Sequence, residues 1–420
     1  MVDKTFPFLK STLEEVSKQH PTPFYIYDEN AIRQQARSLN QAFSWNNGFK
    51  EYFAVKAAPN PFILKILKQD GLGLDCSSLS ELNLAEKAGL MGEEIMFSSN
   101  DTPIDEFIKA ASIGAIINFD DINHISFLDK YIPLPNIICL RFNPGHLKTG
   151  NLIIGHPVES KFGLTQEQLF DGYRLLRDKG VKRFGLHTMV ASNELDLDYF
   201  IETADMLFQL VIDISKKLGI RFEFVNLGGG IGIPYEPDQQ HVDLQSLSDG
   251  IKLSYQERIV ANNLDPLKIF LECGRLITGP FGYLVTRVRH IKNSYKDFVG
   301  LDACMADLMR PGLYGAYHHI SVPGKESWAP NKIYDVTGSL CENNDKFAIN
   351  RHLPELAIGD LLVIHDTGAH GHAMGFNYNG KLRSAELLLR PTGKIILIRR
   401  AETMDDYFAT IDFHALDNFL

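Results

Sequence analysis

The sequence predicts an α/β fold: a (β/α)8 TIM barrel followed by a C-terminal all-β domain. Eight short apolar segments, rich in β-branched and aromatic residues, alternate with helical segments between residues 52 and 272. Alternation of this kind is typical of a parallel sheet, and eight units in order favour closure into a barrel. The expected strands are 52–55, 73–76, 95–98, 115–118, 137–142, 184–188, 222–227 and 269–272.

Helix signals lie between the expected strands. Residues 61–69 follow the first strand and begin with a proline, and residues 80–89 follow the second and end at Gly89. A doubly wound open sheet would alternate in the same way. The first strand-to-helix turn lacks the G-x-G-x-x-G pattern of such sheets, and the even order of eight units favours the barrel.

The pattern changes after about residue 283. Short strands separated by Gly, Pro and Asp turns are expected around 283–291, 335–338, 360–365 and 394–399, which is typical of an all-β domain. The apolar segment 24–28 is expected to join them. We therefore predict a barrel over residues 40–283, and a β domain made of residues 1–39 and 284–420.

Composition excludes several classes of function. The chain of 420 residues is 45% hydrophobic and 22% charged, as expected for an ordinary globular protein. Its net charge of −10 is spread along the chain without a basic block, which disfavours nucleic acid and anionic membranes as partners. The sequence shows neither a signal-peptide pattern nor an apolar run long enough to span a bilayer. We expect a cytoplasmic enzyme with a small-molecule substrate.

Cysteines and histidines do not indicate a metal site. The five cysteines are scattered without C-x-x-C spacing, so a disulfide framework or structural zinc is not expected, and most should be buried thiols. The histidines of 365–372 and the pair at 318–319 do not match a recognised zinc spacing. A metalloenzyme remains a minor alternative.

Polar residues cluster at the expected strand ends. In a βα barrel the carboxyl ends of all strands meet at one mouth, where reactive groups gather. Any one of these residues has a turn or a cap as its simpler explanation, but their coincidence in one register favours a shared site. They are Lys56, Asp75, Ser98, Arg141, Asn143, His187, Gly228, Gly229, Gly230 and Glu272.

These residue types suggest pyridoxal phosphate chemistry. A lysine buried in an apolar setting has a lowered pKa and becomes a Schiff-base nucleophile, and we expect such burial for Lys56 because it ends an apolar strand. The alternative is that Lys56 is merely the first exposed residue after that strand. The glycine run, Gly274 with Arg275, and Ser192 offer donors for a phosphate. Glu272 would keep a pyridine nitrogen protonated. The structural alternative for Glu272 is a helix-capping acid.

Ordered motifs along nearly the whole chain carry a resemblance. The chain resembles the alanine-racemase-fold amino-acid decarboxylases, and within them the diaminopimelate decarboxylase family. The motifs are Ala54-Val-Lys-Ala-Ala-Pro-Asn-Pro, Asp75-Cys-Ser-Ser-Leu-Ser-Glu-Leu, Ser160-Lys-Phe-Gly, Asn226-Leu-Gly-Gly-Gly, Glu272-Cys-Gly-Arg, Asp302-Ala-Cys-Met-Ala-Asp-Leu-Met-Arg-Pro, Cys341-Glu-Asn-Asn-Asp and Asn377-Tyr-Asn.

The resemblance implies pyridoxal 5'-phosphate as cofactor, and decarboxylation of meso-2,6-diaminopimelate to L-lysine and CO2. It also implies a homodimer whose two sites lie at the subunit interface, where the β domain completes the substrate site and the dimer interface. It implies a Schiff base on Lys56 and proton donation by Cys341, which reaches in from the partner subunit. The implied cofactor-binding residues are Lys56, Asp75, His187, Met189, Ser192, Gly229, Glu272, Gly274, Arg275 and Tyr378. The implied substrate-binding residues are Arg275, Arg310, Tyr314, Glu342 and Tyr378, with Arg310 and Tyr314 on the distal carboxylate and Glu342 on the distal amino group.

The chain departs from the family pattern at several positions. Met189 replaces the histidine that usually stacks on the cofactor ring, so either the Met189 sulfur or His187 must supply that contact. Ala191 replaces a glycine, and Cys273 replaces the proline that usually follows the glutamate. Cys304 replaces a glycine and His370 a tyrosine. None of these changes removes a catalytic function.

The alternative functions differ in whether the substrate carries a distal carboxylate. A buried Arg310 requires a carboxylate, which is either the substrate's or that of Asp307 or Asp302 in an internal ion pair. A racemase, or a decarboxylase of ornithine, lysine or arginine, would leave Arg310 without a substrate partner. A catalytically dead homologue would have no chemical reason to retain both Lys56 and Cys341.

Overall fold

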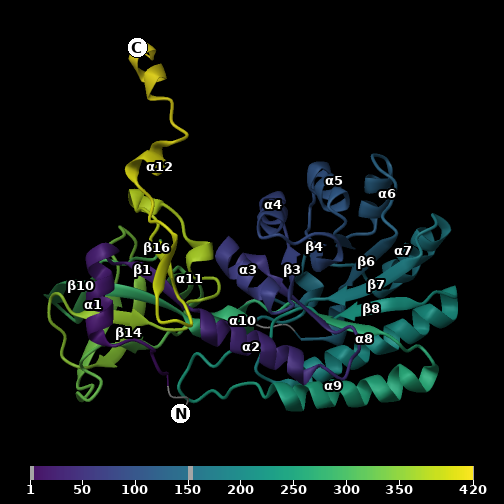
Figure 1. Ribbon diagram of the computed structural model, residues 1–420, viewed down its shortest axis with the longest axis horizontal. Coiled ribbons are helices and arrows are strands. Elements are labelled where there is room, and N and C mark those ends of the chain that lie inside the picture. Colours follow the sequence, from purple (N-terminus) through teal and green to yellow (C-terminus); the bar gives the residue numbers. More distant parts are fainter. Residues whose placement is uncertain (1–3, 150–154, 420) are drawn as a thin grey trace. The chain divides into compact units, whose positions relative to one another are not determined.

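The computed structural model describes residues 4–149 and 155–419, and its chain forms two compact units (Figure 1). Residues 31–149, 155–234 and 238–279 form the first, here called the barrel unit. Residues 4–30, 235–237 and 280–419 form the second, here called the β unit. The expected domain boundaries at residues 40 and 283 stay a prediction, and residues 1–3 and 420 of the expected β domain lie outside the described residues.

The barrel unit confirms the predicted closed barrel. Within the described residues, eight parallel strands pair in chain order, and the first pairs with the last. Each expected strand matches an observed one to within about two residues. The strands are β2 (Lys50–Ala54), β3 (Gly73–Cys76), β4 (Ile95–Ser98), β5 (Ile116–Phe119), β6 (Ile137–Phe142), β7 (Arg183–Thr188), β8 (Phe222–Asn226) and β9 (Lys268–Leu271).

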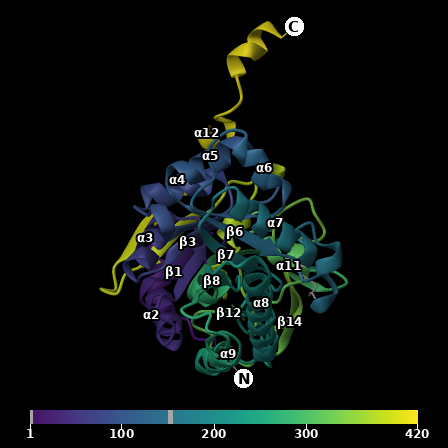
Figure 2. The ribbon, with the colours of Figure 1, turned by 90° about the vertical axis from the view of Figure 1, so that its right-hand side faces the viewer.

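Helices surround these strands (Figure 2). Helix α3 starts where Pro61 fits its first turn, and the Asn60 side chain accepts a hydrogen bond from the Phe62 N–H. Gly89, at φ +89°, lies just beyond helix α4, as the sequence predicts. The helices are α2 (Glu29–Ala42), α3 (Pro61–Gln69), α4 (Leu79–Lys87), α5 (Ile104–Ser112), α6 (Asn123–Asp129), α7 (Gln166–Asp178), α8 (Leu197–Leu218), α9 (Leu244–Arg258) and α10 (Arg275–Thr278).

Large side chains fill the barrel interior. Phe270 stacks on Phe224 with ring centroids 4.4 Å apart, and its ring also meets Tyr52 at 5.1 Å. Met96, Ile116, Ile137 and Cys139 complete this buried cluster. Because apolar side chains fill the interior, the polar side chains lie at the mouth of the barrel, at the carboxyl ends of the strands.

The β unit is built on a mixed sheet. Nine strands of the described chain form it, in the order β14-β13-β11-β10-β1-β16-β17, with β15 pairing β10 and β12. The expected N-terminal strand is confirmed, because β1 pairs with β10 antiparallel and with β16 parallel. The strands are β1 (Phe24–Asp28), β10 (Gly282–Asn293), β11 (Asp297–Leu301), β12 (Ile320–Ser321), β13 (Lys332–Thr337), β14 (Lys346–Leu353), β15 (Leu361–Ile364), β16 (Ala385–Leu389) and β17 (Ile395–Arg399).

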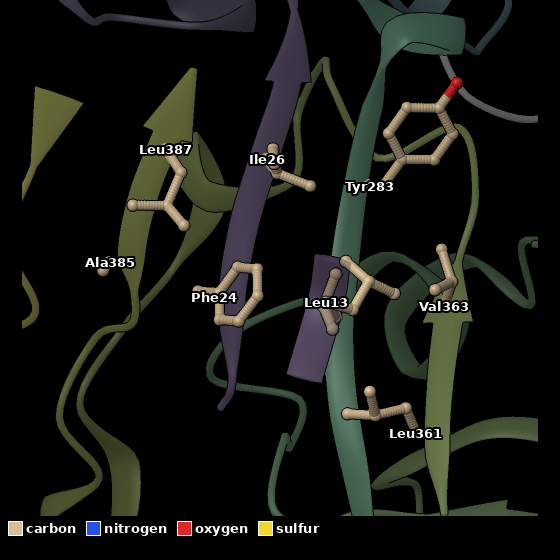
Figure 3. Packing of buried hydrophobic residues seen from close by; sticks show 9 residues of the cluster. Leu13, Phe24, Ile26, Tyr283, Leu361, Val363, Ala385 and Leu387 are labelled. Carbon is tan, nitrogen blue, oxygen red and sulfur yellow. The ribbon is translucent and has the colours of Figure 1, made fainter. Parts of the chain in front are cut away.

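One face of this sheet packs against the N-terminal helix (Figure 3). Leu13 of that helix lies on Phe24, Ile26, Val363 and Leu387, all of which are fully buried. This apolar contact joins the N-terminus to strands that lie more than 300 residues later. The helices of the unit are α1 (Lys10–Gln19), α11 (Arg310–Tyr314) and α12 (Met404–Phe408).

Among the helices formed by residues 4–149 and 155–419, each is too short or too polar to cross a bilayer.

Candidate active site

Lys56 lies just beyond strand β2, in the 3-10 turn η1 (Val55–Ala57). Its two neighbours in the turn are buried, whereas the Lys56 side chain is exposed. The expected burial of this lysine is therefore wrong, because the strand ends two residues earlier and the turn carries the amine out of the apolar segment. Its positive charge still acts on two buried acids: it lowers the pKa of Glu272 and opposes the rise in the pKa of Asp75.

Glu272 follows strand β9 and is 7% exposed. One carboxylate oxygen lies 3.1 Å from His187 Nε2, and the other accepts a hydrogen bond from Asn226 Nδ2 at 2.7 Å. Burial alone would raise its pKa, but His187, Lys56 and Arg141 together hold the pKa below its ordinary value. Glu272 is therefore a buried, ionised and hydrogen-bonded acid, and the helix-capping alternative is wrong.

A chain of hydrogen bonds extends from Glu272 across the barrel. Asn118 Nδ2 lies 2.9 Å from His187 Nδ1 and 3.2 Å from Ser98 Oγ. A donor at Nδ1 selects the histidine tautomer whose Nε2–H donates to Glu272. Asn226 Oδ1 accepts from the Gly228 N–H at 2.9 Å, which ties the acid to the glycine run. The network thus fixes Glu272 from several strands.

Asp75 is a second buried acid at the mouth, at the end of strand β3. Burial and the nearby Glu272 raise its pKa well above the ordinary value, opposed by Lys56. Its Oδ1 atom is buried and has no hydrogen-bond partner in the described protein. A buried carboxyl oxygen without a protein partner leaves a polar group available to a bound molecule.

The two expected phosphate loops lie side by side. The Glu194 N–H donates to Gly230 O at 2.9 Å, the Gly232 N–H donates to Glu194 O at 2.7 Å, and Asn193 Oδ1 accepts from the Ile233 N–H at 3.0 Å. Because Ser192 immediately precedes this ladder, its hydroxyl belongs to the same loop pair as Gly229. The contacts bring together two candidate phosphate donors about 37 residues apart in sequence.

The glycines are required by close packing. A Cβ on Gly229 would lie 2.2 Å from the Glu272 carbonyl oxygen, and one on Gly228, at φ +73°, would lie 2.3 Å from Thr188 O. A Cβ on Gly274 would lie 2.6 Å from the Ala57 Cβ. The glycine loop therefore packs against the Glu272 segment, which in turn packs against the turn that carries Lys56.

Met189 and His187, the two alternatives for the ring contact, differ in their surroundings. His187 is 1% exposed and both of its ring nitrogens are engaged, by Asn118 and Glu272. Met189 is half-buried, and its sulfur accepts a hydrogen bond from the Gly229 N–H at 3.2 Å. This arrangement favours Met189 as the side chain that meets a bound ring, which stays a prediction.

Met189 also lines a depression in the barrel unit. Arg141, Asn143, Ser160 and Phe162 line the same depression. The Arg141 guanidinium lies over the Phe162 ring at 4.5 Å, and its Nη1 is 3.1 Å from Asp120 Oδ1. The fixed positive charge of Arg141 contributes to the low pKa of Glu272.

Arg275 is the last expected cofactor residue of the barrel unit. It is 8% exposed and begins α10, directly after the glycine that packs on the Lys56 turn. Together these observations show that the mouth carries an accessible amine, an ionised acid and glycine loops. The residues present fit pyridoxal phosphate: Lys56 for its aldehyde carbon, Glu272 for its ring nitrogen, and Ser192, Gly229 and Arg275 for its phosphate.

Arg310 of the β unit is buried, at 3% exposed. Its Nη1 lies 2.9 Å from His318 Nε2, and its guanidinium lies 4.6 Å from the centre of the Tyr235 ring. His318 Nδ1 donates to the His365 carbonyl at 2.8 Å, so Nε2 carries the lone pair that accepts from Arg310. The sequence missed both His318 and Tyr235, because their contacts with Arg310 depend on tertiary structure.

The other expected residues of the β unit lie at its surface. Tyr314 is 49% exposed and Tyr378 is 52% exposed. Cys341 is exposed, whereas the other four cysteines are buried, which confirms the expectation that most thiols are buried. The Cys341 N–H donates to Asn379 Oδ1 at 2.6 Å, which holds the Cys341 and Tyr378 loops together. Glu342 accepts from the Asn344 N–H at 3.2 Å.

Two histidines of the segment 365–372 have hydrogen-bond partners in the β unit. His365 Nε2 lies 2.7 Å from Ser321 Oγ, and His372 Nε2 donates to the Ser384 carbonyl at 3.0 Å. Over residues 4–149 and 155–419, we find no group of three metal-ligating side chains that could hold an ion.

A closed βα barrel with this amine, acid and glycine-loop constellation defines a pyridoxal phosphate-dependent enzyme. The family model for the pyridoxal-dependent decarboxylase pyridoxal-binding domain matches residues 29–279, and the chain belongs to this family of carbon-carbon lyases. The resemblance inferred from the motifs is thereby confirmed.

Relatives extend this similarity over nearly the whole chain. Protein TabA of Pseudomonas amygdali pv. tabaci is 45% identical over 97% of this chain and 95% of its own length. A diaminopimelate decarboxylase of Methanothermobacter thermautotrophicus is 35% identical over 93% of this chain and 92% of its own. The crystal structure of diaminopimelate decarboxylase from Helicobacter pylori complexed with L-lysine has a TM-score of 0.84 and 29% identity, covering 97% and 100% of the two chains.

Proposed function

We propose that this chain decarboxylates meso-2,6-diaminopimelate to L-lysine and CO2, in lysine biosynthesis. The observation that carries this proposal is the similarity, over more than nine tenths of both chains, to relatives named diaminopimelate decarboxylase. The lysine complex of the Helicobacter pylori structure agrees with lysine as the product. The buried Arg310 adds a chemical reason, because it suits a substrate with a second carboxylate.

The barrel unit supplies the groups for bond cleavage. When bound, pyridoxal phosphate accepts the electron pair of the broken carbon-carbon bond. Lys56 provides the amine to which it attaches, and the ionised Glu272 holds a proton at the ring nitrogen. Ser192, Gly229, Arg275 and Tyr378 bind its phosphate. Asp75, His187, Met189 and Gly274 complete the cofactor-binding residues.

The β unit supplies groups that select the substrate. Arg310 presents a planar guanidinium to the distal carboxylate, assisted by the Tyr314 hydroxyl, and Glu342 pairs with the distal amino group. Arg275 and Tyr378 also contact the substrate. The tautomer of His318 fixes the orientation of Arg310, since its Nε2 lone pair engages one guanidinium nitrogen.

Cys341 donates a proton to the carbon that has lost CO2. We propose that it does so in the active site of a partner subunit, so that the working enzyme is a homodimer with shared active sites. The exposed position of Cys341 supports this, because the thiol lies where another chain can reach it. We place the enzyme in the cytoplasm.

Product analysis tests this function. Purified, cofactor-loaded protein is incubated separately with meso-diaminopimelate, ornithine, lysine and arginine, and the amine products and CO2 are measured. We expect lysine and CO2 from meso-diaminopimelate at a rate well above those of the other three. Faster release of CO2 from a substrate without a distal carboxylate would contradict the proposal and favour the same-fold decarboxylase of another basic amino acid.

The substrate assay is especially informative because TabA, which is more similar to this chain than the diaminopimelate decarboxylase of Methanothermobacter thermautotrophicus, has a name that states no substrate. A Lys56→Ala variant serves as the negative control throughout. CO2 release by the variant at the parent rate would point to a contaminating enzyme or a wrong lysine assignment. Tight cofactor binding without CO2 release from any of the four amino acids would favour the alternative of a non-catalytic homologue.

A further inference from the structure

Glu51 is a buried acid to which the proposed function gives no role. It lies in strand β2, five residues before Lys56, and is 1% exposed. Its Oε1 accepts a hydrogen bond from the Cys273 N–H at 2.6 Å. This contact joins the strand that precedes the lysine to the residue that follows Glu272.

The contact completes a set of anchors around Glu272. On one side of that residue, the Glu272 N–H donates to Gly228 O at 2.8 Å. On the other side, the Cys273 N–H donates to Glu51. The carboxylate itself is held by His187 and Asn226. Both peptide groups and both carboxylate oxygens of Glu272 therefore have defined partners.

The need for Glu51 follows from the residue at position 273. A proline there, as the resemblance describes for related enzymes, has no N–H. Cysteine restores a donor in a place that is 1% exposed, and a buried N–H without an acceptor is costly. Glu51 supplies the acceptor, so the two residues depend on each other.

The surroundings of Glu51 favour its neutral form. Burial raises its pKa well above the ordinary value, and the nearby Glu272 and Asp75 raise it further, against the hydrogen bonds from Cys273. Its Oε2 is buried without a hydrogen-bond partner in the described protein. A neutral carboxyl can accept the Cys273 N–H without placing a second negative charge beside Glu272.

We propose that Glu51 is a positioning residue, whose acceptor oxygen fixes the Glu272–Cys273 peptide and thereby holds the Glu272 carboxylate at His187 and Asn226. The proposal rests on the role assigned to Glu272 at the cofactor's ring nitrogen. Its energetic basis, the pairing of Glu51 with the Cys273 N–H, is independent of the substrate.

A double-mutant cycle tests the pairing. Glu51→Leu keeps the volume but removes the acceptor, Glu51→Gln keeps the acceptor without the acidic proton, and Cys273→Pro removes the donor. Each variant is measured for thermal unfolding of the protein without cofactor and for affinity toward pyridoxal phosphate by absorbance. Cys273→Ala, which keeps the N–H, is the matched control for loss of the thiol.

We expect Glu51→Leu to lower the unfolding temperature and to weaken pyridoxal phosphate binding by roughly 10-fold, within the range for an orphaned buried N–H. Glu51→Gln should stay within about twofold of the parent, and Cys273→Ala should leave the effect of Glu51→Leu unchanged. In the Cys273→Pro background, Glu51→Leu should change the unfolding temperature and the affinity for pyridoxal phosphate only slightly, because the N–H donor is absent.

If Glu51→Leu lowers the unfolding temperature and the cofactor affinity equally in the parent and in the Cys273→Pro background, the proposal is overturned. If Cys273→Pro fails to fold, the comparison of Glu51→Gln with Glu51→Leu decides, and equal damage by both would also overturn it. Neither readout requires turnover, so a failure to decarboxylate meso-diaminopimelate would sink the proposed function while leaving this test intact.

Discussion

The site residues of the barrel unit and those of the β unit differ in how they are held. In the barrel unit, Glu272 is buried and is linked by hydrogen bonds through His187 on strand β7 to Asn118 on strand β5. In the β unit, Tyr314, Tyr378 and the Cys341 thiol are exposed. The fold sets the protonation state of buried, hydrogen-bonded groups. The protonation state of an exposed group depends on solvent and on the molecules that bind to it.

The exceptions in each unit sharpen this comparison. In the barrel unit, Lys56 is exposed although the sequence predicts its burial, and an exposed amine can reach a cofactor. Arg310 is the buried group of the β unit, where His318 and the Tyr235 ring fix its guanidinium. We infer that the barrel unit sets the chemistry and that Arg310 sets the specificity.

Loss of Lys56 should have the largest effect. Lys56→Ala removes the attachment point for the cofactor, so decarboxylation should fall by at least ~10³-fold and the absorption band of the attached cofactor should disappear. Steady-state assays and absorbance spectra check this. Lys65→Ala, on the barrel helix α3, is the control, and a parent rate in Lys56→Ala would refute the assignment.

Loss of the Glu272 charge should have the second largest effect on activity. Glu272→Gln keeps an oxygen for Asn226 but cannot hold a proton at the ring nitrogen by its charge, so we expect kcat to fall by about 100- to 1,000-fold. The fold should survive, because the side chain keeps its shape. Assays on protein with verified cofactor content check this, and an unchanged kcat would show that the buried network only supports structure.

Subunit mixing tests whether the exposed Cys341 serves a second chain. Lys56→Ala and Cys341→Ala should each be inactive, but equal mixing should restore about a quarter of parent activity, because half of the dimers are hybrid and each has one intact site. Activity is measured after exchange has been verified with a tagged subunit. Failure to recover activity despite exchange would count against shared sites.

The smallest expected effect is the change with pH in the stability difference between Glu51→Gln and the parent protein. Because the folded-state pKa of Glu51 is raised, its favourable contribution is complete below the unfolded-state pKa, near 4.5, and is lost as pH rises toward the folded-state value. Glu51→Gln does not titrate. Its stability advantage over the parent should therefore grow by up to about 1.4 kcal/mol per pH unit across that window.

Denaturant unfolding at several pH values checks this last prediction. Glu272, Asp75 and Cys273 face Glu51, and their own titration is common to both proteins. A difference between parent and variant that stays constant with pH would show that Glu51 is ionised in the folded protein.

Local signals were enough to predict the barrel. The strands are short apolar segments, and signals of the helices between them are visible in the sequence, such as Pro61 at the start of α3 and Gly89 just beyond α4. Because the carboxyl ends of the strands meet at one mouth of a βα barrel, the sequence also predicts that Glu272, His187 and Asp75 lie there.

Features that depend on distant partners were not predictable. The expected burial of Lys56 is wrong because β2 ends one residue earlier than expected, at Ala54, and the turn that follows carries the lysine out of the apolar segment. Asn118 was missed as a partner of His187, although a polar residue at the end of a strand could have drawn attention to it. Glu51 meets Cys273 across 222 positions of sequence, which no local pattern reveals.

Arg310→Lys tests the central claim most directly. The substitution keeps the charge but loses the two-pronged grip on a carboxylate, so kcat/KM for meso-diaminopimelate should fall by roughly 10- to 1,000-fold, or about 1.4–4 kcal/mol of transition-state binding. Slow decarboxylation of lysine, which lacks the distal carboxylate, should change little. Equal losses on both substrates would show that Arg310 supports the fold or the cofactor, and would contradict the assignment of meso-diaminopimelate as the substrate.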